Sequence, residues 1–105
     1  MTEHHQLLRV LLRFEIEPGQ EQEFEKTWLS VAAGIAAQPA NLAQSLHRGV
    51  DEASTYYVLT DWRDRDSFTA FETSAAHQEN LRRLRPFRRG GWMHTMNVAY
   101  TLDPR

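Results

Sequence analysis

The sequence of 105 residues contains no cysteine. This absence excludes disulfide bonds, thiolate metal sites and cysteine nucleophiles together, and it is compatible with a reducing compartment. The first residues, MTEHHQ, lack the basic and then apolar layout of a signal peptide. No apolar run approaches the roughly 20 residues that span a bilayer. We therefore expect a cytoplasmic protein that has no membrane partner.

An excess of charge of one sign is also lacking. The 12 Lys and Arg residues stand against 14 Asp and Glu residues, which gives a formal net charge of −2. Such a chain has no basic field that would attract nucleic acid and no acidic tail. We expect no nucleic-acid partner.

Motifs for metal, phosphate and nucleophilic sites are missing as well. The five histidines show no His-x-His or His-x-x-x-His spacing, and they are His4, His5, His47, His77 and His94. There is no glycine-rich phosphate loop, dinucleotide fingerprint or nucleophile elbow. We expect neither a metal nor a cofactor, so any chemistry would rely on the electrons of the substrate itself.

What is present is a clear alternation of apolar residues. A period of two residues predicts strands over residues 7–17, 42–50, 55–62 and 92–102. Helical spacing predicts two helices, over about 21–38 and 67–84. The resulting order is β-α-β-β-α-β.

This order predicts a ferredoxin-like α+β fold, with two helices on one face of a four-stranded antiparallel sheet. We expect a single domain over residues 7–102, a flexible N-terminus over 1–6 and a C-terminal tail over 103–105. Two helices can cover only one face of the sheet, and the other face still carries large apolar side chains. An uncovered apolar patch is typical of a partner surface. We therefore predict a homodimer joined sheet to sheet.

The predicted second helix, which Asp64 or Asp66 can cap, contains a candidate functional arginine. At about 100° per residue, Phe71 and Arg82 lie within roughly 20° of each other, so Arg82 falls in the apolar stripe. It either points into a pocket, where its guanidinium would stabilise an anion, or packs its stem and reaches the surface. The same arithmetic turns His77 towards solvent.

The third strand places Trp62 on one face with Tyr56, Val58 and Thr60. If that face looks towards the helices, a set of rings and one cation surrounds a cavity, namely Trp28, Trp62, Phe68, Phe71 and Arg82. Such a lining suits a flat, conjugated ligand. The alternative is that these rings form an ordinary core. Phe24, at helical spacing from Trp28, extends the aromatic stripe of the first helix.

Two segments, LLRFEIEPGQEQEFEKTW and YYVLTDWRDRDSFTAFETSAAHQENLRRLRP, resemble the antibiotic biosynthesis monooxygenase family. The shared pattern is a strand, Pro-Gly, an acidic helix with Phe and Trp, and then a strand that ends in Trp and is followed by DSF, a Ser and a His. The similarity covers about residues 7–102. It implies a dimeric α+β barrel, and members include cofactor-independent oxygenases that convert anthrones to quinones, haem-degrading enzymes and proteins without a known reaction.

The resemblance also implies roles for particular residues. Trp62 and Arg82 match pocket residues of the anthrone oxygenases, whereas Val58 and Phe68 stand where those relatives have Asn and Tyr. The haem-degrading members place a Trp and a His where this sequence has Phe71 and Leu81. An axial ligand for haem is therefore missing.

Two functions remain open at this point. The first is an enzyme, a monooxygenase or cyclase-assisting protein that acts on an aromatic polyketide intermediate. Arg82 would stabilise an enolate or phenolate, Trp62 and Trp28 would stack on the rings, and the proton would pass to a base for which the candidates are Tyr56, His47 and His94. The second is a dimeric protein that binds a hydrophobic aromatic without turnover, which the apolar Val58 and Phe68 favour.

Overall fold

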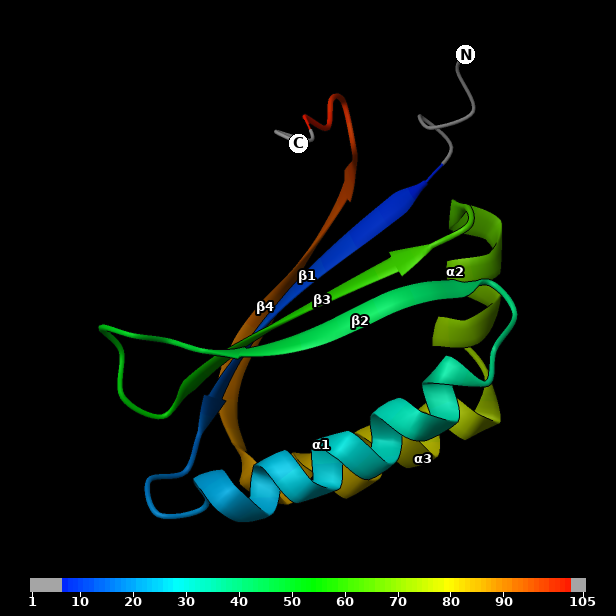
Figure 1. The fold of residues 1–105 in the computed structure, drawn as a ribbon. Helices are drawn as coiled ribbons and strands as arrows, with labels where there is room; N and C mark the ends of the chain where they lie inside the picture. Colours follow the sequence, from blue (N-terminus) through cyan, green and yellow to red (C-terminus); the bar gives the residue numbers. More distant parts are fainter. Residues whose placement is uncertain (1–6, 103–105) are drawn as a thin grey trace.

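A four-stranded antiparallel sheet carries all of its helices on one face in the computed structural model, which describes residues 7–102 (Figure 1). In chain order the elements are β1 (Leu8–Ile16), α1 (Glu21–Ala36), β2 (Asn41–Arg48), β3 (Thr55–Trp62), α2 (Arg65–Glu72), α3 (Ala75–Leu84), the short 3₁₀ helix η2 (Arg85–Phe87) and β4 (Arg88–Asn97). The strand order is β2-β3-β1-β4. The predicted ferredoxin-like fold is confirmed. The segments predicted as flexible terminus and tail, 1–6 and 103–105, lie outside the described residues.

Strand β1 is central and divides the two faces of the sheet as its alternation predicts. Its apolar side chains at Leu8, Val10, Phe14 and Ile16 are buried under the helices. On the opposite face Arg9 forms a two-point ion pair with a neighbouring carboxylate of β3, with nitrogen to oxygen distances of 2.7 and 2.9 Å. The apolar core therefore lies between the sheet and the helices, on the side where a pocket is expected.

The second helical region is not one helix, as its apolar spacing suggested, but two. Asp64 caps α2 by accepting a hydrogen bond from the Ser67 amide at 2.7 Å. The chain then breaks at Thr73, and Ser74 caps α3 by accepting from the His77 amide at 3.2 Å. The Thr73 hydroxyl also donates to the Thr69 carbonyl oxygen at 3.0 Å. Ser and Thr side chains compete with the helical backbone in this way, and the break resets the angular phase of every residue after it.

Strand β4 begins and ends earlier than predicted. Gly90 and Gly91 lie inside the strand, paired with β1, instead of separating it from the helix. The last pair in the ladder joins Leu8 to Asn97. Because β1 begins at Leu8, residues 98–102 have no strand beside them to pair with, and the alternation that continues in the sequence forms no ladder.

The outer face of the sheet has no helix over it within residues 7–102 (Figure 1). It carries Leu11 and Leu59 next to Trp92 and Met96, and the last two are 40% and 37% exposed. The patch expected from the sequence is therefore present, while the homodimer stays a prediction. Across the described part of the chain, no helix has the length and apolar character needed to cross a membrane.

Candidate functional site

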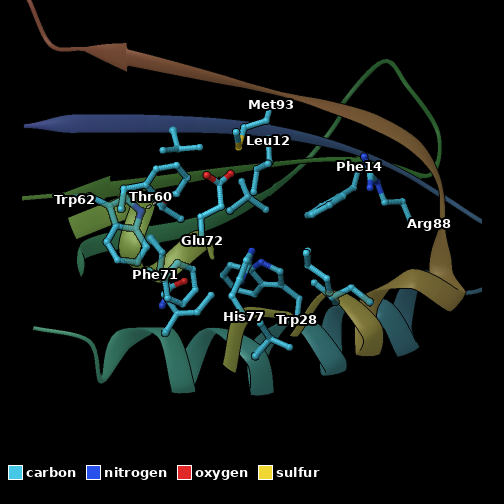
Figure 2. A pocket seen from close by; sticks show the side chains of 18 of the residues that line it. Leu12, Phe14, Trp28, Thr60, Trp62, Phe71, Glu72, His77, Arg88 and Met93 are labelled. Carbon is cyan, nitrogen blue, oxygen red and sulfur yellow. Dashed lines mark hydrogen bonds between the residues drawn. The ribbon is translucent and has the colours of Figure 1, made fainter. Parts of the chain in front are cut away.

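A cavity of about 260 Å³ lies between the inner face of the sheet and the helices (Figure 2). Strands β1, β2, β3 and β4 form one wall, and α1, α2 and α3 form the other. The main apolar lining residues are Val10, Leu12, Phe14, Trp28, Val31, Val58, Trp62, Phe68, Phe71 and Met93. An apolar cavity with a few polar groups is the usual form of a small-molecule site.

Trp62 closes one end of this cavity and is also part of the core. It is 2% exposed, and its indole N–H donates to the Thr60 hydroxyl oxygen at 3.0 Å. Its ring stacks on Phe71 with a centroid distance of 4.8 Å, and Phe68 packs against it at 5.5 Å. Because the N–H is satisfied within the protein, the indole offers a bound ligand an apolar surface.

Among residues 7–102, two buried polar atoms of residues that line the cavity lack a hydrogen-bond partner: Oε1 of Gln44 and Nδ1 of His77. The Gln44 side chain is held in place because its Nε2 donates to the Ala32 carbonyl oxygen at 2.6 Å. Its remaining oxygen can only accept a hydrogen bond. Both atoms therefore keep an unused capacity to accept a hydrogen bond.

The ionisable residues among the described lining are Glu72, His77 and Arg88 (Figure 2). Desolvation by burial lowers the pKa of His77, and the negative charge of Glu72 raises it in part. The imidazole packs on the Phe71 ring at a centroid distance of 4.5 Å. It is consequently neutral at neutral pH and able to accept a proton. Arg88 lies over the Phe14 ring, 5.7 Å from its centroid.

The inward orientation predicted for Arg82 is wrong. Its guanidinium pairs with Glu79 one turn earlier on α3, at 2.6 and 2.9 Å, and its side chain is 68% exposed. The prediction carried the helical angle from Phe71 through the break at Ser74, where the phase changes. The same error led to the prediction that His77 faces solvent, whereas the His77 side chain points into the cavity.

The three bases considered from the sequence do not line the cavity. His47 is exposed and forms a 2.8 Å hydrogen bond with Ser45, and His94 lies against Trp92 on the outer face. Tyr56 donates its hydroxyl to Glu25 at 2.5 Å, and its burial raises the pKa of the phenol to about 12. A proton acceptor for the cavity must be sought elsewhere.

The ligand-contacting rings predicted from the sequence are largely brought together. Trp28, Val58, Phe68 and Phe71 all line the cavity with Trp62. Phe24 does not, because its ring is enclosed in the core between Phe14 and Tyr56. Sequence reasoning missed the polar residues Gln44, Glu72 and His77. The Thr-Ser pair before His77 was the signal for a new helix start, and hence for a change of phase.

No set of three His, Cys, Asp or Glu side chains within residues 7–102 is placed to hold a metal ion. The sequence matches the family described as antibiotic biosynthesis monooxygenase over residues 7–83. The chain belongs to this family. The matched range includes the strands and helices that line the cavity, except β4 and the last residue of α3.

Individual relatives agree with this assignment. Protein SchA of Streptomyces halstedii is 25% identical over 92 residues, which are 88% of this chain but only 24% of SchA. This chain therefore spans about a quarter of that relative. The crystal structure of SnoaB, a cofactor-independent oxygenase from Streptomyces nogalater, is similar with a TM-score of 0.85, 24% identity and coverage of 95% of this chain and 99% of SnoaB.

A further solved structure is a putative antibiotic biosynthesis monooxygenase from Caulobacter crescentus. Its TM-score is 0.83 at 21% identity, with 92% of this chain and 93% of that chain covered. At these identities the similarity to both structures establishes the fold. The chemistry has to be argued from the cavity.

Proposed function

We propose that this protein is a cofactor-independent monooxygenase that oxidises a flat, polycyclic aromatic compound of the anthrone type, an intermediate of aromatic polyketide synthesis. The observation that carries the proposal is the cavity lined by aromatic rings between the sheet and the helices. Family membership supports it, as does the similarity to SnoaB, itself a cofactor-independent oxygenase. The cytoplasmic location expected from the sequence stays a prediction.

The proposed reaction needs only the substrate and dioxygen. Removal of a proton from the anthrone methylene leaves the C–H electron pair on the ring system as an enolate. One electron passes to dioxygen, and the ring radical and superoxide combine to form a peroxide. Loss of water breaks the O–O bond and leaves a carbonyl group. One oxygen atom enters the quinone, the other leaves as water, and four electrons pass from carbon to dioxygen.

The lining provides what this chemistry requires of a protein. Trp62 and Phe71 stack on each other at one end, with their planes 29° apart, and give that end aromatic walls against which a planar ring system can pack. The apolar walls exclude water, which protects the enolate and the peroxide from side reactions. The main contribution of the protein is therefore to bind, to take the proton and to shield the intermediate.

Oxygen uptake with dithranol, a simple dihydroxylated anthrone, tests the proposal. The wild type is expected to consume oxygen faster than the autoxidation background. Met93→Trp fills the cavity and should bring the rate back to the background, whereas Arg82→Ala alters only an exposed ion pair and should keep the wild-type rate. A wild-type rate equal to the background would contradict the oxygenase assignment.

The second candidate function is binding of an aromatic ligand without turnover. Val58 and Phe68 favour it, because both are buried, line the cavity and offer no polar contact to a substrate or to oxygen. Under this alternative a stable dihydroxyanthraquinone quenches tryptophan fluorescence, and dithranol is released unchanged. Haem binding, which Leu81 at the position of the haem-degrading relatives' histidine disfavours, would appear as a Soret band on titration.

We propose, in addition, that two copies of the chain associate through the outer face of the sheet. Size-exclusion chromatography at micromolar concentration should then give twice the 12.2 kDa of one chain. Leu59→Asp places a charge in the middle of this face, where burial without a partner is unfavourable, and should give a monomer. Leu29→Asp, at a site of α1 that is 67% exposed, is the matched control and should leave the dimer intact. A wild type that elutes as one chain would rule the dimer out.

A further inference from the structure

The buried, unpartnered Nδ1 of His77 is the feature of the cavity that the proposed function does not yet use. A buried polar atom without a hydrogen bond is unfavourable by about 1–3 kcal/mol. Native proteins keep few such atoms, and those found in a cavity point to a ligand that completes them. Here the atom belongs to the one imidazole among the described lining residues.

The surroundings of His77 suit a group that accepts a proton and later returns it. Its ring is fixed against Phe71, and the Ser74 cap orders the first turn of α3 from which it extends (Figure 2). Burial keeps it neutral, and the nearby carboxylate of Glu72 favours the imidazolium once a proton has arrived. The two effects oppose each other, and the burial effect is the larger, so the pKa of His77 lies below its usual value.

We infer that His77 is the proton acceptor of the cavity, and that its Nδ1 removes the proton from the acidic carbon or phenolic oxygen of a bound hydroxylated aromatic ring. The inference rests on the proposed function for the nature of that ligand. The bond from hydrogen to carbon or oxygen breaks, its electron pair stays on the ring system, and the proton forms the imidazolium. Nε2 carries the hydrogen of the neutral ring throughout. The imidazolium then returns its proton to the peroxide oxygen that leaves as water.

Gln44 gives this site its preference for hydroxylated ligands. Its Nε2 is committed to the Ala32 carbonyl, so its Oε1 presents only an acceptor to the cavity. Together with Nδ1 of His77 it matches a ligand that has two hydrogen-bond donors, such as a ring system with phenolic hydroxyls. An O-methylated analogue would leave both acceptors unpartnered.

The inference predicts an acid limb in the pH profile. Proton removal requires neutral His77, so the rate should fall as the pH drops through the pKa of His77, which burial holds below its usual value. The charged groups that line the cavity together with the imidazole are Glu72 of α2 and Arg88 of β4, and of these Glu72 acts on the pKa of His77. Glu72→Gln removes the charge that raises this pKa, and it should move the acid limb to a lower pH.

Proton removal can be measured without oxygen. Under anaerobic conditions in D₂O, the methylene protons of dithranol exchange for deuterium, and NMR follows their loss. The wild type should accelerate the exchange above the buffer rate. His77→Gln should reduce the accelerated rate about a hundredfold, the usual contribution of a general base, while the exposed His47→Gln is the matched control and should retain it.

The outcomes separate this inference from the proposed function. If deuterium exchange depends on His77 but no oxygen is consumed, His77 is supported as the base and the oxygenase assignment is rejected. Oxygen uptake can instead occur with an exchange rate that His77→Gln leaves unchanged, or with no accelerated exchange in the wild type. Either result rejects His77 as the base and leaves the oxygenase assignment intact. Circular dichroism checks the fold of each variant. If His77→Gln is unfolded, the pH profiles of wild type and Glu72→Gln decide, and an acid limb that does not move overturns the inference.

Discussion

Replacing Trp62 with alanine is expected to lower the free energy of unfolding by about 4 kcal/mol, in the range observed when large aromatic side chains are removed from cores. The indole is 2% exposed, stacks on Phe71 and makes a hydrogen bond to the Thr60 hydroxyl. Its loss would leave that hydroxyl buried and would join a new void to an existing cavity. Urea denaturation followed by circular dichroism measures the change.

A matched substitution shows whether the effect belongs to the site. Leu29→Ala removes a large apolar side chain from α1 at a position that is 67% exposed, and it should change the free energy by less than about 0.5 kcal/mol. Trp62→Phe keeps an aromatic ring, and its loss of unfolding free energy should lie between those of the two alanine variants. Equal losses for Trp62→Ala and Leu29→Ala would mean that Trp62 is not enclosed as described. The expected result makes Trp62 both a core residue and the end wall of the cavity.

The fold could be predicted from the sequence because its main signals are local. In β1 the side chains that alternate in the sequence alternate between core and outer face in the structure, from Leu8 to Ile16. The Pro-Gly turn and the acidic residues after it begin α1 at Glu21, where the Glu21 carboxylate accepts from the Gly19 amide at 2.9 Å. These features depend on neighbours within a few residues, so the periodic pattern of the sequence predicts them well.

The polar part of the candidate site could not be predicted, because it depends on the angle at which a short helix leaves a break. A single helix through Ser74 would turn Arg82 inwards and His77 outwards, whereas two helices do the opposite. The side chain of one serine decides between these arrangements. The role of Gln44 could not be predicted for another reason. Its orientation is set by a hydrogen bond to α1, which is distant in the sequence.

The apolar residues Val58 and Phe68 support a different function when the position of His77 is considered. From the sequence alone, they remove polar contacts from the predicted pocket and favour a binding protein. In the structure the cavity has other polar groups, contributed by β2, α2 and α3 through Gln44, Glu72 and His77. The apolar residues of β3 therefore agree with an enzyme whose ionisable groups Glu72 and His77 lie on the opposite, helical wall, and this is the arrangement that the exchange experiment tests.

The second large effect is expected at Gly91, where β4 pairs with the central strand β1. Gly91 has φ of +152°, and a Cβ added there would lie closer to the Arg13 carbonyl oxygen than the 3.0 Å that real Cβ atoms keep. That oxygen belongs to the central strand and cannot move without breaking the β1–β4 ladder. Gly91→Ala should therefore lower the free energy of unfolding by about 3 kcal/mol, or the melting temperature by roughly 15 °C.

Gly90→Ala is the matched control for this substitution. Its Cβ would meet only the end of the Glu15 side chain, 3.2 Å away, and that carboxylate can rotate aside. The cost should stay below about 1 kcal/mol. Because Met93 follows two residues later and lines the cavity, a displaced Gly91 should also weaken quenching of tryptophan fluorescence by dihydroxyanthraquinone, while Gly90→Ala leaves it unchanged. Equal stability of the two variants would mean that β4 pairs with β1 in another register, and the cavity wall would then have to be built from different side chains.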